Sequence, residues 1–142
     1  EVLASQPGQY RRLPASQVFE NLMQRFPQID AVVSANDDMA VGIVEALYAA
    51  GRGGQTKVVG IDGIPDAIQA IAEGKMFATV DFSGHDQAYL GIQAAVRHLK
   101  GEKIPEEILL PVFIIDKNNV NTVARTPEER PVPSWDKVVG KA

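Results

Sequence analysis

Apolar segments with the character of strands alternate along this chain with segments that repeat at the period of a helix. Residues 31–35 form an apolar strand that runs directly into the polar corner Asn36-Asp37-Asp38, and a helical stripe follows. Residues 57–61 form a second apolar strand, which ends at Asp62 and precedes another helical segment. Parallel strands need helical crossovers of this length, so the alternation predicts an α/β fold with a doubly wound, mostly parallel sheet in the flavodoxin-like manner.

The same periodicity predicts about five strands and four helices. The expected strands are the segment around Leu3 and residues 31–35, 57–61, 76–82 and 108–115. The expected helices carry apolar stripes within residues 18–26, 39–50, 67–72 and 88–99. Gly51 and Gly74 are expected to stop two of these helices. Pro111 lies inside the last strand, which predicts an edge position or a bulge there.

Polar side chains follow two of the expected strands at their carboxyl ends. Asn36 follows residues 31–35, and Asp62 directly follows residues 57–61. Ligands of open parallel sheets bind outside the carboxyl ends of the strands, where an amide and a carboxylate can bind hydroxyl groups. Tyr10 follows the segment around Leu3 at the same expected edge, and its ring suits the face of a sugar. The three residues together predict a site for a polar, hydroxyl-rich ligand.

The Asn36-Asp37-Asp38 corner and Asp62 also have a purely structural interpretation. Asp37 or Asp38 is a good N-cap, because an aspartate there accepts a backbone hydrogen bond and favours the positive end of the helix dipole. Asn36 then stands one residue before the cap, at the exit of the strand. Asp62-Gly63 is a common turn dipeptide, so Asp62 can also be explained by the turn alone.

Composition and charge exclude several classes of function. The chain has 142 residues, 45% of them hydrophobic, which is enough for one domain with a core. A net charge of -4 argues against nucleic acid as a partner. The absence of cysteine excludes disulfides and thiolate chemistry and fits an oxidising compartment. His85 and His98 lack acidic partners at ligand spacing, and no serine-histidine-acid order is present, so we predict no metal, no cofactor and no catalytic residue.

Seven short motifs carry a resemblance to a known family. They are Leu3-Ala4-Ser5-Gln6-Pro7, Ile29-Asp30-Ala31-Val32, Ala35-Asn36-Asp37-Asp38-Met39-Ala40-Val41-Gly42, Val58-Val59-Gly60-Ile61-Asp62-Gly63, Ala67-Ile68 with Gly74-Lys75, Ala78-Thr79-Val80, and Leu99-Lys100-Gly101-Glu102. Together they resemble the C-terminal part of a periplasmic sugar-binding protein of the ribose-binding type, the solute receptor of an ABC transporter. The resemblance covers roughly residues 3–122.

The resemblance implies roles for individual residues. In that family the Asn of the Ala-Asn-Asp corner and the Asp of the Gly-x-Asp-Gly corner bind sugar hydroxyls, which implies these roles for Asn36 and Asp62. An aromatic residue after the first strand stacks on the sugar, and Tyr10 stands there. Family members commonly read the sugar with a Gln after the Ala-Thr-Val strand. In this chain that place is held by Phe82 with Asp81 beside it, so the resemblance implies that Phe82 and Asp81 contact the ligand, while the departure from Gln argues against ribose itself.

Two other function classes remain open at this point. The same corners occur in the effector domains of lactose-repressor-type transcription regulators, although the Pro-Pro-Leu-Thr-Thr stretch typical of those proteins is absent here. An enzyme or phosphoacceptor of flavodoxin-like fold could instead use Asp37, Asp38 and Asp62 as an acidic magnesium pocket. Such a pocket would need a lysine at a later strand exit, where only the poorly placed Lys117 is available.

The resemblance also implies a division of the chain and its partners. Residues 1–82 are expected to form a C-terminal lobe that is incomplete at its N-terminus, with the true start upstream. Residues 83–107 should pack on a missing N-terminal lobe, residues 108–122 return as a strand and turn, and residues 123–142 form an irregular Pro-rich tail with Trp135 as anchor. The expected partners are a sugar, a membrane permease, and either the missing lobe or a second copy bound through Ile92, Val96 and Leu99. The implied location is periplasmic or otherwise extracytoplasmic, with a lipid anchor in the full-length protein.

Overall fold

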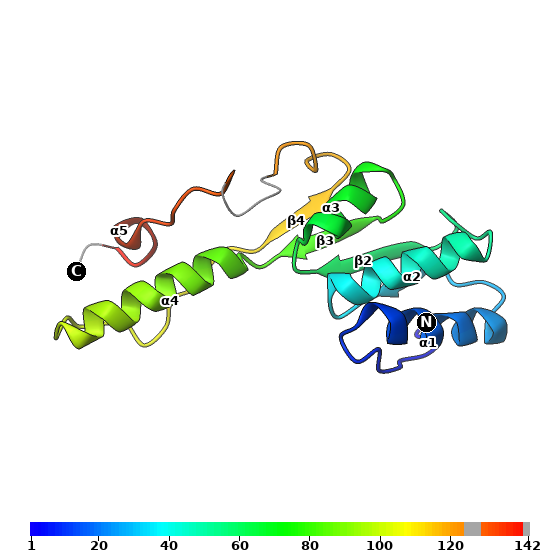
Figure 1. Cartoon of the computed structure of the whole chain (residues 1–142), viewed down its shortest axis with the longest axis horizontal. Helices are drawn as coiled ribbons and strands as arrows, with labels where there is room; N and C mark the ends of the chain where they lie inside the picture. The colour runs from blue at the N-terminus through cyan, green and yellow to red at the C-terminus, as the bar shows by residue number, and fades with distance from the viewer. Residues whose placement is uncertain (124–128, 141–142) are drawn as a thin grey trace.

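The computed structural model describes residues 1–123 and 129–140 and confirms the alternation of strands and helices (Figure 1). The described strands are β1 (Ala31–Val33), β2 (Lys57–Ile61), β3 (Ala78–Asp81) and β4 (Phe113–Asp116). The described helices are α1 (Arg12–Arg25), α2 (Asp37–Ala49), α3 (Pro65–Ala72), α4 (Gly84–Leu99) and α5 (Trp135–Val138). None of the described helices has the length and hydropathy needed to cross a membrane.

The four strands form one sheet in the order β1-β2-β3-β4. The first three are parallel, and β4 pairs antiparallel with β3, with Thr79 opposite Ile115. The predicted α/β class with a mostly parallel sheet is therefore confirmed. The edge position expected for the last strand is also confirmed, although β4 begins only after Pro111 and Val112. Because proline cannot donate to a ladder, the pairing starts beyond it.

Helices α2 and α3 cover one face of the sheet, and α1 packs on α2. Strand residues that face these helices are buried, among them Val58, Thr79 and Ile115. The core around them combines Phe19 of α1, Leu47 of α2 and Ile68 and Ile71 of α3. The alternate strand positions point to the opposite face, where the apolar side chains of Val33, Ile61 and Ile114 are exposed. The side chains on this face are apolar, as is typical of a buried sheet, but none of the described helices covers it.

Glycines allow the closest approaches between elements. A Cβ added to Gly60 of β2 would meet the Asp37 carboxylate and stand 3.1 Å from the Ala40 Cβ, both on α2. A Cβ added to Gly42 of α2 would meet the carbonyl oxygen of Arg12 in the first turn of α1. The missing side chains thus let α2 lie directly against both the sheet and α1.

The strand expected around Leu3 is wrong. Residues 1–8 have no regular structure, and the Leu3 side chain is exposed. In the described residues β1 pairs only with β2, so no neighbouring strand offers hydrogen bonds to this segment. An apolar run becomes a strand only where its backbone groups find a partner.

The helix ends follow local signals with one correction. Pro14 lies in the first turn of α1, where a missing backbone N–H costs nothing. Gly51 and Gly74 follow α2 and α3 with φ of 68° and 72°, as expected of glycines that stop helices. The N-cap of α2, however, is Asn36 and neither Asp37 nor Asp38, because the Asn36 Oδ1 accepts from the Met39 N–H at 3.0 Å.

Helix α4 extends away from α1, α2 and α3 (Figure 1). Leu90 is its one buried residue, whereas Ile92, Val96 and Leu99 are 67%, 45% and 86% exposed. The short helix α5 lies near α4, with the Trp135 ring 4.9 Å from the Arg97 guanidinium. The described part of the Pro-rich tail therefore includes one helical turn, contrary to the wholly irregular tail expected. Residues 124–128 of that tail lie outside the described residues.

Candidate functional site

Three parallel strands present their carboxyl ends at one edge of the sheet. The segment after β1 holds Asn36, the residue after β2 is Asp62, and β3 ends with Asp81 before Phe82. Asp81 lies beside the corner that follows β2, because a Cβ built on Gly63 would stand 3.1 Å from the Asp81 Cβ. The fold thus brings the strand-exit residues predicted from the sequence to the same edge.

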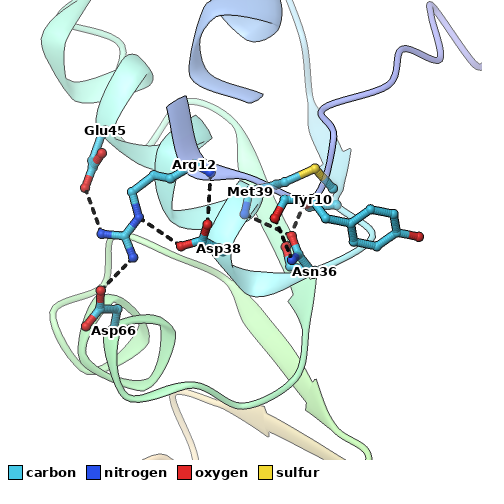
Figure 2. A network of polar contacts seen from close by, with 8 residues as sticks. Tyr10, Arg12, Asn36, Asp38, Met39, Glu45 and Asp66 are labelled. Atoms are coloured by element: carbon cyan, nitrogen blue, oxygen red, sulfur yellow. Dashed lines mark hydrogen bonds and ion pairs between the residues drawn. The ribbon is translucent and has the colours of Figure 1, made fainter. Parts of the chain in front are cut away.

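Asn36 and Tyr10 come together across 26 positions of the chain. The Asn36 side-chain amide donates to the Tyr10 carbonyl oxygen at 3.4 Å, while its oxygen caps α2 (Figure 2). Tyr10 adopts a left-handed φ of 55°, and 69% of the residue is exposed. Figure 2 shows its ring pointing away from Asn36 and from the surrounding helices. The Tyr10 ring is therefore an exposed apolar surface on a residue whose backbone the Asn36 amide contacts.

Asp37 is a buried carboxylate that joins three parts of this edge. Its Oδ2 accepts from the backbone N–H of Gly63 at 2.7 Å and of Ile64 at 3.1 Å. Its Oδ1 accepts from the Thr79 hydroxyl on β3 at 2.6 Å. Burial raises the pKa of Asp37, and the three hydrogen bonds oppose this rise. The sequence offered one signal for this role, Gly60 in the middle of an apolar strand, where a side chain would collide with the carboxylate.

Asp62 occupies a strained backbone position next to Asp37. Its φ is 133°, a region that a residue with a side chain rarely adopts, and Gly63 follows with φ of 72°. Asp62 is half-buried, and this burial raises its pKa against a hydrogen bond from the Asp37 backbone. The hydrogen bonds that Gly63 and Ile64 donate to Asp37 hold the corner in this shape. A carboxylate is thereby kept near the N-terminal end of α2.

Asp81 is already committed to two partners. Its Oδ1 accepts from the Ser83 N–H at 2.7 Å, and its Oδ2 pairs with the Arg130 Nη2 at 2.8 Å. Phe82 is half-buried, and its carbonyl oxygen accepts from the Gln87 side chain. Arg130 belongs to the tail, for which the sequence suggested no function. Its contact with Asp81 was not predictable from a local pattern.

Asp38 belongs to a separate charge network (Figure 2). Arg12 donates to Asp38 through its backbone N–H at 2.9 Å and through Nε at 3.2 Å, and its Nη2 reaches Asp66 at 2.6 Å. Glu45 completes the network at 3.6 Å. This arrangement ties the start of α1 to α2 and α3.

The acidic magnesium pocket of the alternative interpretation is not supported. Asp37 is turned into the core, and Asp38 is paired with Arg12. Among residues 1–123 and 129–140, no group of three His, Cys, Asp or Glu side chains is arranged to hold a metal ion.

Comparison with known proteins adds evidence that the geometry alone does not contain. Residues 1–103 match the profile of the periplasmic binding protein domain. The chain is 40% identical over 116 residues to the ribose import binding protein of Escherichia coli, an overlap of 82% of this chain and 39% of that protein. It is 39% identical over 104 residues to the D-allose-binding periplasmic protein of Escherichia coli, which covers 73% of this chain and 33% of that protein. The chain thus spans between one third and two fifths of the length of these relatives.

Solved structures show the same fold. A periplasmic solute-binding protein of Actinobacillus succinogenes with bound D-allose superposes with a TM-score of 0.84 at 32% identity, over 87% of this chain and 43% of that one. The myo-inositol-binding protein of Caulobacter superposes with a TM-score of 0.82 at 30% identity, over 90% of this chain and 44% of that one. These proteins are solute-binding proteins, which favours that class over the repressor-type alternative.

Proposed function

Because the chain belongs to the periplasmic binding protein family, we propose that it forms part of a solute receptor that binds a monosaccharide or polyol for an ABC transporter. The observation that carries the proposal is the shared strand edge, where Asn36, Asp62 and the exposed ring of Tyr10 come from three different loops. Hydroxyl groups are both donors and acceptors, so a carboxylate, an amide and a flat ring suit a sugar. The named relatives bind ribose, allose and inositol, which supports this ligand class.

The proposed mechanism is capture of the ligand without chemical change. Asp62 accepts hydrogen bonds from sugar hydroxyls, the Asn36 amide contributes a further polar contact, and Tyr10 covers one face of the ring. The remainder of the cleft comes from a second lobe, and ligand binding stabilises the closed arrangement of the two lobes. The closed form then docks on a membrane permease. We place the receptor outside the cytoplasm, in the periplasm or held at the membrane by a lipid anchor.

Isothermal titration calorimetry of the full polypeptide that carries this chain tests the proposal. The ligands are D-ribose, D-allose and myo-inositol, with a disaccharide as a negative control. We expect saturable binding of at least one of the three, and recovery of that ligand unchanged after prolonged incubation, as observed by NMR. Absence of binding to all three, or conversion of a bound sugar into a product, would contradict a receptor for this ligand class.

The apolar face of α4 is proposed to contact a further protein surface. Ile92, Val96 and Leu99 stand on this helix with large exposed fractions. A groove of about 410 Å³ runs along the same helix between Tyr89 and Lys100. Apolar patches of this kind seldom remain in contact with water. We infer that the second lobe covers this face in the receptor, and that a second copy covers it when the chain is isolated.

Light scattering of the isolated 142-residue chain tests this contact. We expect the wild type to self-associate, and a variant with Ile92→Ser, Val96→Ser and Leu99→Ser to be monomeric, because the substitutions remove the apolar face without touching the core. Leu13→Ser on α1 is the control, since Leu13 is exposed to a similar extent outside α4 and should leave association unchanged. A wild-type chain that is a monodisperse monomer would rule out association through α4.

A further inference from the structure

The C-terminal tail is fastened at two points. Arg130 pairs with Asp81 at the carboxyl end of β3, and the side chains of the pair are only 22% and 12% exposed. Further along, Trp135 is 8% exposed, and its ring lies under the Arg97 guanidinium of α4. A buried charge pair is costly unless its geometry is good and its other bonds are satisfied. Asp81 meets that condition because Ser83 donates to its second oxygen.

The candidate site has an excess of hydrogen-bond acceptors. The carboxylate oxygens of Asp62 and Asp81 accept hydrogen bonds, and the Phe82 side chain neither donates nor accepts. The Asn36 amide oxygen accepts from the first turn of α2, and one of its two N–H groups donates to the Tyr10 carbonyl oxygen, so these two residues offer only the second N–H of Asn36 and the Tyr10 hydroxyl as donors. The ring and hydroxyl oxygens of a sugar or polyol, however, also need donors. The guanidinium of Arg130 has five N–H donors in a planar fork, and the Asp81 contact joins only one of its two terminal nitrogens to the carboxylate.

We propose that Arg130 is a ligand-contacting, specificity-determining residue, which the tail carries to the carboxyl end of β3. Asp81 acts as a positioning residue: it holds the guanidinium so that the remaining N–H groups donate to an oxygen of the bound sugar. This assignment replaces the direct ligand contact predicted for Asp81 from the sequence. It rests on the proposed function, because it concerns the same site and the same ligand class.

The substitution Arg130→Lys separates contact with the ligand from docking of the tail. Arg130→Lys keeps a positive charge for Asp81, but its three N–H donors sit on a single nitrogen, so it lacks the second terminal nitrogen that the guanidinium can extend to a ligand while the first bonds Asp81. Trp135 is the one tryptophan of the chain, so its fluorescence reports whether the tail remains on α4. We expect Arg130→Lys to retain the emission of the wild type. We also expect it to weaken binding by about tenfold to a hundredfold, the effect of losing one charged hydrogen bond.

The experiment is a calorimetric cycle on the full polypeptide, using whichever of D-ribose, D-allose and myo-inositol binds the wild type, together with its monodeoxy analogues. If Arg130 bonds one hydroxyl of the ligand, the wild type binds the analogue that lacks this hydroxyl more weakly than the parent ligand. Arg130→Lys should then bind that analogue and the parent with similar affinity, while it still discriminates against the other analogues as the wild type does. Two results would overturn the proposal: wild-type affinity in Arg130→Lys and Arg130→Ala, or an equal loss of affinity for the parent ligand and every analogue, which indicates a structural role alone. A wild type that binds no ligand of the panel would overturn the proposed function itself, and this assignment with it.

Discussion

Replacing Asp37 with leucine is expected to lower the free energy of unfolding by about 3 kcal/mol. Leucine has a similar branched shape and fills the space without admitting water, but it accepts no hydrogen bond. The backbone N–H groups of Gly63 and Ile64 are then left without the acceptor that holds the corner after β2. Each unpaired buried group costs about 1 to 3 kcal/mol. Urea denaturation of the chain, followed by circular dichroism, measures the change.

Asp37→Asn is the matched control. An asparagine oxygen can still accept from Gly63 and Ile64, and its amide can donate to the Thr79 oxygen once the hydroxyl hydrogen rotates away. We therefore expect Asp37→Asn to cost less than about 1 kcal/mol. Equal destabilisation by leucine and asparagine would show that charge, and not hydrogen bonding, holds this corner.

The raised pKa of Asp37 predicts how stability depends on pH. Burial penalises the ionised carboxylate, so the folded state binds a proton at a pH where the unfolded chain has released it. The wild-type chain should therefore lose stability relative to Asp37→Asn as pH rises from the ordinary aspartate pKa through the raised one. Comparing the two proteins in urea across this interval isolates the contribution of Asp37.

Replacing Asp62 with alanine is expected to abolish detectable sugar binding. Asp62 is the half-buried carboxylate that the corner after β2 holds at the ligand edge, and each charged hydrogen bond lost costs about 1.5 to 3 kcal/mol. Two such bonds correspond to at least about a hundredfold loss of affinity. Calorimetry on the full polypeptide with the ligand that binds the wild type gives the answer, and unchanged affinity would exclude Asp62 from the site.

Asp62→Gly distinguishes loss of the ligand contact from collapse of the corner. Glycine adopts a φ of 133° without strain, whereas aspartate does not, so this variant should lose binding and yet unfold at the same or a higher urea concentration. A variant that loses both binding and stability would indicate that Asp62 supports the fold.

Because burial raises the pKa of Asp62, the affinity of the wild type for its sugar should also fall as pH decreases, starting at a higher pH than the one at which an ordinary aspartate is protonated.

Local patterns were sufficient for most of the fold and part of the site. The helical stripes located α1 to α4, and the apolar runs located β1 to β3, because both periods are properties of neighbouring residues. The parallel order then brought Asn36 and Asp62 to one edge, as predicted. The strand around Leu3 failed for the opposite reason: a strand needs a hydrogen-bonding neighbour, which is not a property of its own residues.

The sequence by itself determined the elements, the mostly parallel sheet and the edge at which polar groups gather, since these depend on periodicity and on the chirality of crossovers. Only the tertiary structure decided which of those polar groups have partners within the chain. Asp37 and Thr79 are 42 positions apart, and their contact turns a candidate cap into a buried support. Arg130 reaches Asp81 from the tail and turns a candidate ligand residue into an ion-pair partner. Such contacts depend on the distance between side chains in space, and no local pattern of residues encodes that distance.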